Sequence, residues 1–252
     1  MTTLVAAEFH KIVTTRLWLW LMLAAMSITA LYASLNIGFA DNTVTYPLST
    51  QQGQQTLIGV AAGAAKPLAA VFGAVGITTE FRHRTATPTF LATPHRGRVV
   101  AAKLITYAVA GIGLGMASTV VVVAIAVPWL SARGIDLALT ANDLPGTMAG
   151  GIVSVAIYAM IGVGLGALLR DQVATVVGLL IYLYVVETVV TQIPALGDWT
   201  VYLPGPAGSS LTGLALITRE FLPAWQGGLA LAGYALAFAL AGTFLAVRRD
   251  IS

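Results

Sequence analysis

Long apolar runs divide this 252-residue chain, and they constrain its fold more than any other feature. A bilayer core of about 30 Å needs roughly 20 apolar residues in a helix. The runs of that length are Leu17–Ala40, Leu57–Thr79, Leu104–Leu130, Met148–Leu169, Val173–Ile193 and Ala224–Val247. The sequence therefore predicts an all-α integral membrane protein, with six transmembrane helices in a single transmembrane domain over residues 1–252.

Composition agrees with this class. The chain is 58% hydrophobic and only 9% charged, whereas soluble domains have about a quarter of their residues charged. The net charge of +3 does not gather on a soluble face, so we expect no nucleic-acid partner. With no cysteine there is no disulfide or thiolate metal site. The first run is too long for a cleavable signal peptide and is expected to remain as an anchor.

The connections between the runs differ in their basic residues, which sets the predicted orientation. The termini and the even-numbered connections carry Lys11, Arg16, Arg82, Arg84, Arg96, Arg98, Lys103, Arg170, Arg248 and Arg249. The other connections carry only Arg133 and Arg219. We therefore expect a multi-pass protein of a prokaryotic cytoplasmic membrane, with both termini in the cytoplasm.

Residues 4–16, before the first run, have the pattern of a short amphipathic helix. Val5, Phe9, Ile12 and Val13 fall on one face, and Glu8 lies elsewhere. Such a helix would lie on the inner leaflet with its apolar stripe at the headgroups. The alternative is that these residues extend the first span into the cytosol.

The cytoplasmic connection from Glu80 to Lys103 is longer than a simple connector needs to be. Thr87 and Pro88 resemble a helix N-cap followed by proline at the first helical position, and Pro94 disfavours helix just before it. The pattern predicts a helix of one or two turns that presents Phe90 and Leu91. An apolar pair of this kind suits docking on a soluble partner. The alternative is a solvated basic loop that only fixes topology.

The external connection Pro194–Pro223 contains four prolines and the apolar stretch Leu211–Ile217. Seven residues are too few to cross a bilayer. We expect a re-entrant or surface-lying hairpin, with an ordinary external loop as the alternative.

Two ionisable residues, Lys66 and Glu187, fall inside predicted spans. A charge within hydrocarbon costs several kcal/mol and normally faces a partner or a wet path. Both lie about 9–13 Å below the external edge at 1.5 Å per residue. We therefore predict an intramembrane charge pair; the alternative is that each side chain reaches separately to the outer interface.

Small residues recur within two spans, as Gly111-x-Gly113-x-Gly115 and Gly162-x-Gly164-x-Gly166. Glycine at such spacing lets helix backbones approach closely. The pattern predicts tight packing of the third and fourth spans and indicates no chemistry.

Catalytic and metal-binding patterns are missing from the sequence. It has no G-x-x-x-x-G-K-[ST] phosphate loop, so we expect no ATP hydrolysis by this chain. Its histidines, His10, His83 and His95, are scattered outside the spans. We expect them to be solvated and predict no catalytic residue, no metal site and no cofactor in this chain.

At several places the chain resembles permease subunits of the type-two ATP-binding-cassette exporters, the family of daunorubicin-type multidrug and polysaccharide export permeases. The N-terminal segment 7–18 is similar to the interfacial helix of that family. The loop matches its E-x-x-x-G-T, P-x-R and K pattern at Glu80, Thr85, Pro94, Arg96 and Lys103, but Arg84 stands where glycine is usual. Residues 162–172, 186–187 and 202–204 resemble its fourth span, fifth span and external segment.

The resemblance implies a partner that carries the chemistry. Two permeases, identical or paralogous, would dock on two ATPase subunits that bind ATP and Mg²⁺. They would move an amphipathic or hydrophobic drug, antibiotic, peptide or lipid outward. The ATPase-coupling residues that it implies are Glu80, Thr85, Thr87, Pro88, Phe90, Leu91, Pro94 and Arg96.

Other classes remain open on the sequence. An ion-coupled secondary transporter needs an intramembrane acid, for which Glu187 is a candidate, and often two related halves, which are not evident here. A non-transporting membrane scaffold would explain the spans but not the long basic loop. A membrane enzyme lacks candidate catalytic groups.

Overall fold

A computed structural model describes residues 1–40, 46–82, 96–213 and 222–248, and this part of the chain is helical, without a strand. The elements before the third connection are α1 (Thr2–Thr14), α2 (Leu17–Gly38), α3 (Gln51–Arg82) and α5 (Arg96–Ala132). Those after it are α6 (Leu144–Leu169), α7 (Gln172–Ile181), the π-helix η2 (Tyr182–Val186), α8 (Glu187–Thr191), the 3-10 helix η3 (Pro194–Tyr202), α9 (Pro204–Ser210) and α10 (Ala224–Arg248).

Six of these helical segments are long and apolar enough to cross a membrane, which confirms the predicted all-α membrane class. They are Leu17–Gly38, Gln51–Arg82, Gly97–Ala132, Leu144–Leu169, Gln172–Thr191 and Ala224–Phe244. The second and third are longer than the apolar runs predicted. Each continues through polar residues, at Gln51–Thr56 in α3 and at Arg96–Lys103 in α5, because backbone hydrogen bonds do not depend on side-chain polarity.

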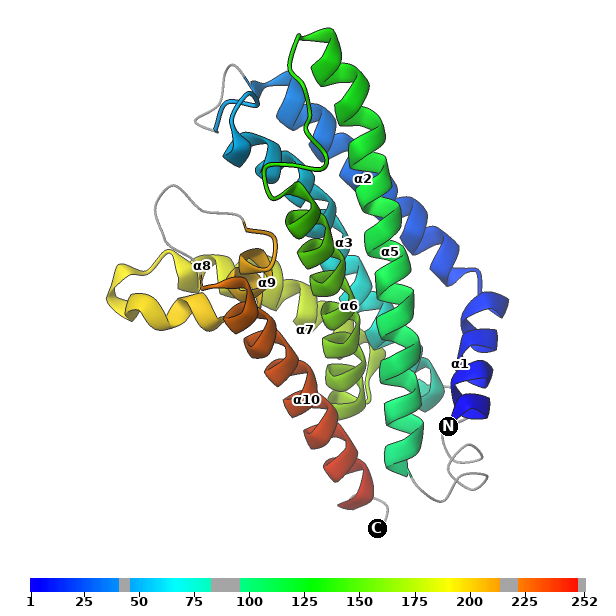
Figure 1. The fold of residues 1–252 in the computed structure, drawn as a ribbon. Helices are drawn as coiled ribbons and strands as arrows, with labels where there is room; N and C mark the ends of the chain where they lie inside the picture. Colours follow the sequence, from blue (N-terminus) through cyan, green and yellow to red (C-terminus); the bar gives the residue numbers. More distant parts are fainter. Residues whose placement is uncertain (41–45, 83–95, 214–221, 249–252) are drawn as a thin grey trace.

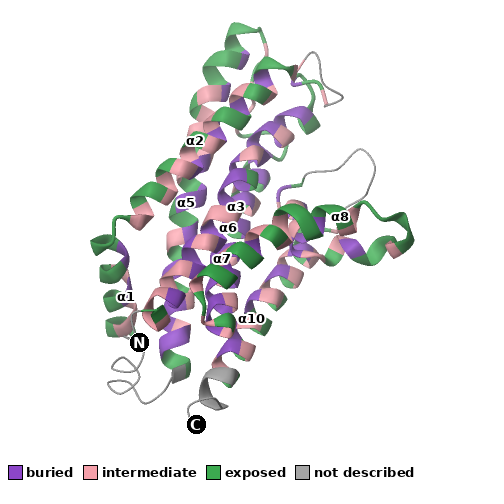
Figure 2. Ribbon diagram, turned by 180° about the vertical axis from the view of Figure 1, so that it is seen from behind, coloured by how far each residue is buried: buried purple, intermediate pink, exposed green. Residues whose placement is uncertain are grey.

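The helices form a bundle with α3 and α6 at its centre (Figures 1 and 2). In each of these two spans 61% of the most apolar segment is buried, against 17% in α2 and in the α7–α8 span. Helix α6 packs against α3, α5 and α10. Helix α1 and the C-terminal end of α10 lie at the same end of the bundle, which we call the terminal end. The first turns of α3 and α6 lie toward the opposite end.

The close packing of α3 on α6 depends on glycine. A methyl group added at Gly162 would fall on the carbonyl oxygen of Ala70, and one added at Gly73 would fall on that of Ala159. The two helices therefore touch backbone to backbone at both positions. Gly111 and Gly115 of α5 likewise face Ala156 and Ile152 of α6. The predicted role of these glycines in packing holds at these positions.

Gly113, in contrast, has open space where a Cβ would be, so the glycine pattern offers a matched pair of variants. We expect Gly162→Ala to destabilise the fold by about 1–3 kcal/mol, because α3 and α6 must separate to admit the methyl group. Gly113→Ala should leave stability unchanged or slightly raised, since alanine favours helix. Thermal unfolding of the two detergent-solubilised variants measures the difference, and equal stabilities would contradict the close packing.

After the fifth span the chain turns back through a series of short helices. Helix α7 continues through η2 and α8, and the chain then returns through η3 to α9. Helix α9 packs against α10 and α6; a methyl group at Gly227 of α10 would meet Ser210, and one at Gly150 of α6 would meet the carbonyl of Leu211. Part of the predicted external connection, residues 214–221, lies outside the described residues.

Candidate functional site

Among the described residues, four charged side chains from three helices meet at the terminal end of the bundle. They are Glu8 and Lys11 of α1, Glu80 in the last turn of α3 and Lys103 near the start of α5, and we call them the charge cluster. Lys103 Nζ donates to Glu8 Oε2 at 2.5 Å and to Glu80 Oε1 at 2.9 Å. Lys11 Nζ donates to Glu8 Oε1 at 2.6 Å and to Glu80 Oε1 at 2.7 Å. Each lysine therefore bridges both carboxylates.

The charge cluster is largely withdrawn from solvent. The side chain of Lys103 is 2% exposed, that of Glu8 7% and that of Glu80 12%. Burying such charges is costly unless each has an opposite partner and hydrogen bonds. Two positive and two negative groups in alternation meet that requirement. The cluster therefore fixes α1 against the ends of α3 and α5 by ion pairs that are largely buried.

Lys11, which is 48% exposed, closes the solvent side of the cluster. Partial burial opposes its charge, but hydrogen bonds with Glu8 and Glu80 outweigh this and raise the pKa of Lys11 above 10.5. A lysine with a raised pKa in the folded state stabilises the fold fully below its unfolded pKa. That contribution is lost as the pH rises through the folded pKa. At neutral pH this contribution of Lys11 is therefore intact.

The inward face of α1 differs from the apolar stripe predicted for it. Helix α1 ends at Thr14 and α2 begins at Leu17, so it is a separate helix and does not extend the first span. Its buried residues are Glu8 and Ile12, whereas Val13 is 64% exposed. The prediction placed Glu8 off the apolar stripe and gave it no partner, and in the structure two lysines bond to its carboxylate inside the bundle.

Of the predicted ATPase-coupling residues, Glu80 lies in the charge cluster and Arg96 is the first residue of α5. The others, Thr85, Thr87, Pro88, Phe90, Leu91 and Pro94, lie outside the described residues. The predicted short helix between Thr87 and Pro94 therefore stays a prediction. The described structure adds that Glu80, at the start of the connection, is bonded to Lys103, at its end.

Glu187 forms the centre of a second site, beside α9. It follows the π-helix η2, and its side chain is buried although it lies in a span. Its Oε1 accepts a hydrogen bond from the backbone N–H of Gly205 at 2.6 Å, in the first turn of α9. A Cβ at Gly205 would lie 2.8 Å from Oε2, so a larger residue there would displace the end of the Glu187 side chain. π-Helical turns within α-helices frequently occur at functional sites.

Lys66 lies beside the same short helix. Its Nζ lies 5.6 Å from the centre of the Tyr158 ring and would lie 3.3 Å from a Cβ at Gly208. Gly205 and Gly208 are one turn apart on α9, so α9 lies beside both charged side chains. No ion pair joins Lys66 and Glu187 directly among the described contacts. The predicted charge pair of Lys66 and Glu187 stays a prediction.

Sequence reasoning missed two features of these sites. It counted Lys103 only as a topology residue and as part of the family resemblance, and it assigned Glu8 no role. Two pairs in the sequence could have indicated the cluster. Glu8 and Lys11 are close together in α1, and Glu80 and Lys103 stand at the two ends of the connection between the second and third spans. Among the described residues, no group of three or more His, Asp or Glu side chains is placed to hold a metal ion.

No protein-family model and no curated protein matches this sequence. The function is therefore inferred from the residues and their geometry.

Proposed function

We propose that this chain is the transmembrane permease subunit of an ATP-driven exporter of the type-two ATP-binding-cassette class. The observation that carries the proposal is the charge cluster. It joins α1 to both ends of the connection between the second and third spans, through Glu80 and Lys103. A force applied to that connection would reach α1, α3 and α5 together. A membrane scaffold has no need of ion pairs that transmit force among these three helices.

The proposal places the terminal end in the cytoplasm, because ten basic residues lie on that side and two on the other. A soluble ATPase would dock on the connection there and supply ATP and Mg²⁺ chemistry. Closure of the ATPase on its nucleotide would switch the bundle between a conformation open to the inside and one open to the outside. The substrate is an amphipathic or hydrophobic drug, antibiotic, peptide or lipid.

A second permease copy, or a paralogue, would complete the transport path. The support for it is the exposed apolar surface of α2 and of the α7–α8 span, of which only 17% is buried. Val177, Ile181 and Tyr184 on the latter are each about half exposed or more. Lipid would cover the parts of this surface that the second copy leaves free.

The position of α9 supports the re-entrant arrangement proposed for the external connection. Gly208 contacts Lys66, which is halfway along the 32-residue helix α3. Since Lys66 lies about 9–13 Å below the external edge of its predicted span, the chain returns to about that depth before it starts α10. Short helices at such depth are tolerated where protein covers their backbone, and Pro204, Ala207, Gly208 and Ser210 of α9 are buried.

Purification from the native membrane tests the function directly. We expect the chain to co-purify with a soluble ATPase and to show no nucleotide hydrolysis when isolated from it. Steady hydrolysis by the rigorously isolated chain would contradict the proposal, and so would repeated failure to recover any ATPase. An ion-coupled carrier, which would use Glu187 on its ion path, predicts instead substrate movement driven by a pH gradient in vesicles that hold this chain alone.

Phe90 and Leu91 give a sharper test of docking. Replacing both with aspartate should leave membrane insertion intact, because the connection is cytosolic. It should weaken ATPase binding at least tenfold, because carboxylates without partners resist desolvation in an apolar groove. The exchanged variant, Phe90→Leu with Leu91→Phe, keeps the apolar surface and should bind normally. Quantitative pull-down of the ATPase measures both variants, and normal binding by the aspartate variant would make the connection a topological element only.

A further inference from the structure

Outside the charge cluster, Arg82 and Arg170 lie together at the terminal end of the bundle. Arg170 is in the turn between α6 and α7, and its Cζ lies 5.7 Å from the centre of the Phe81 ring in the last turn of α3. Arg82, the next residue of α3, donates from Nη1 to Gln172 Oε1 at 3.4 Å. We call Arg82, Arg170 and Gln172 the arginine turn.

Arg170 adopts a backbone conformation that is unusual for its residue type. Its φ is 58°, in the left-handed region, where glycine would end α6 with less strain. The side chain is partly exposed, and Nη2 is covered but has no hydrogen-bond acceptor among the described residues. The guanidinium group therefore has donors that the described protein does not use.

The acidic side chains beside this turn are already engaged. The carboxylate of Asp171 accepts a hydrogen bond from the N–H of Ala174 at 2.7 Å and so caps α7. Glu80 bonds to both lysines of the charge cluster. The sequence after Arg82, residues 83–95, lies outside the described residues and holds basic but no acidic side chains. This connection therefore adds no negative side chain to the arginine turn.

Exposed apolar side chains flank the same turn. Leu169 is 46% and Val173 70% exposed, one on each side of Arg170. The fifth span, Gln172–Thr191, has 20 residues and at 1.5 Å per residue reaches about 30 Å, the thickness of a hydrocarbon core. Its first residue therefore lies where acyl chains meet headgroups.

We propose that the arginine turn binds the phosphate group of an anionic phospholipid. Guanidinium groups donate paired hydrogen bonds that fit a phosphate, and basic pockets between spans on the cytoplasmic side bind such headgroups. Long arginine side chains turn from the end of a span toward the headgroups, which would give Arg170 its acceptor. The acyl chains would cover Leu169 and Val173. This binding does not depend on the proposed export function.

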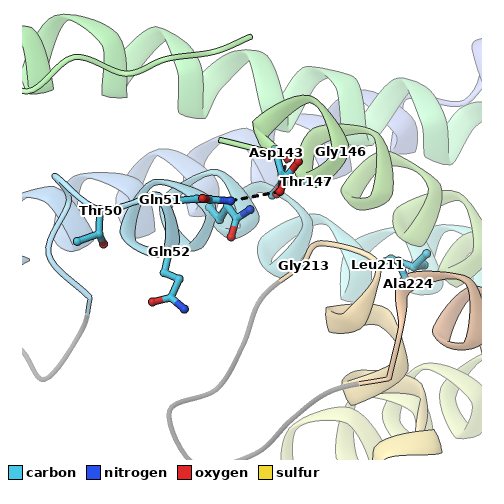
Figure 3. A pocket seen from close by; sticks show the side chains of 10 residues that line it. Thr50, Gln51, Gln52, Asp143, Gly146, Thr147, Leu211, Gly213 and Ala224 are labelled. Atoms are coloured by element: carbon cyan, nitrogen blue, oxygen red, sulfur yellow. Dashed lines mark hydrogen bonds between the residues drawn. The ribbon is translucent and has the colours of Figure 1, made fainter. Parts of the chain in front are cut away.

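The opposite end of the bundle supplies a control. There Asp143 lines a pocket between the starts of α3 and α6 and accepts a hydrogen bond from Gln51 Nε2 at 3.2 Å, as the dashed line in Figure 3 shows. Arg133, in the loop between α5 and α6, is exposed at that end. Arg133→Gln changes the net charge of the chain as much as a variant in the arginine turn does.

Lipid titration of the full chain in detergent, followed by native mass spectrometry, tests the proposal. Dioleoyl phosphatidylglycerol is anionic, and dioleoyl phosphatidylcholine has the same acyl chains without the net charge. We expect tighter binding of the first phosphatidylglycerol than of the first phosphatidylcholine. Arg170→Gln and Arg82→Gln should each weaken phosphatidylglycerol binding about fivefold. Arg82 is exposed, so its variant should fold even if the other does not.

The control Arg133→Gln should bind phosphatidylglycerol as tightly as the unchanged chain. Equal affinity in the unchanged chain and in both variants of the arginine turn would overturn the proposal. Asp250, which lies outside the described residues, is tested as Asp250→Asn. A fivefold rise in affinity there would show that Asp250 neutralises the turn in place of a lipid. Loss of ATPase in a pull-down by Arg170→Gln, with lipid affinity kept, would make the turn a protein contact and would also overturn the proposal.

Discussion

Replacing Lys103 with methionine is expected to destabilise the folded chain by about 3–5 kcal/mol, the usual cost of removing one partner from a buried ion pair. Methionine fills much of the lysine volume, so the loss comes from charge and not from a cavity. Glu8 and Glu80 would both lose the buried ammonium group that bonds to each of them, while Lys11 would still bond to both. Denaturant or thermal unfolding in detergent measures the loss, together with the yield of folded protein.

Lys11 provides the matched control, because it bonds to the same two carboxylates. Its side chain is 48% exposed, against 2% for Lys103, so water can replace it as a partner. Lys11→Met should therefore cost no more than about 1 kcal/mol. The double variant Glu8→Gln with Lys103→Met should recover part of the loss, since it leaves one carboxylate with Lys11. Equal losses in Lys103→Met and Lys11→Met would show that burial does not govern the cluster.

The membrane class could be predicted from the sequence because it depends on a local property, the length of each apolar run. Every predicted span has a helix in the structure. The helix ends could not be predicted as well. Gln54 and Gln55, which precede the predicted span, lie inside α3, and their side chains bond to the backbone of the loop before α6.

The charge cluster could not be predicted from local patterns. Glu8 and Lys103 are 95 positions apart, and Glu80 and Lys11 are 69 apart. The apolar pattern along α1 places Glu8 only off the apolar stripe, because a local pattern does not show a lysine supplied by another helix. The depth of Lys66 and Glu187 could be predicted, because it follows from their positions within the apolar runs. The position of α9 beside both residues could not be predicted, because its seven residues, rich in Gly, Pro and Ser, do not form an apolar run.

Replacing Glu187 is the other variant from which we expect a large effect. Glu187→Leu removes both the acceptor for the N–H of Gly205 and a charge near Lys66. We expect a loss of about 3 kcal/mol or more, since a buried unpaired donor alone costs about 1–3 kcal/mol. Glu187→Gln keeps a carbonyl oxygen for Gly205 and should lose less. Unfolding in detergent separates the hydrogen-bond effect from the charge effect, and equal losses in the two variants would show that Gly205 gains nothing from its bond.

A double-mutant cycle on Lys66 and Glu187 then tests whether the two charges are coupled across α9. Lys66→Met alone leaves Glu187 without a positive neighbour, and Glu187→Gln alone leaves Lys66 without a negative one. If each charge stabilises the other, Lys66→Met with Glu187→Gln should recover part of the sum of the single losses, a coupling of about 0.5–3 kcal/mol. Low-dielectric surroundings in a span screen charge poorly, so two charges there can interact beyond ion-pair distance. If the losses simply add, the charges act independently, and α9 depends on Glu187 only through the hydrogen bond to Gly205.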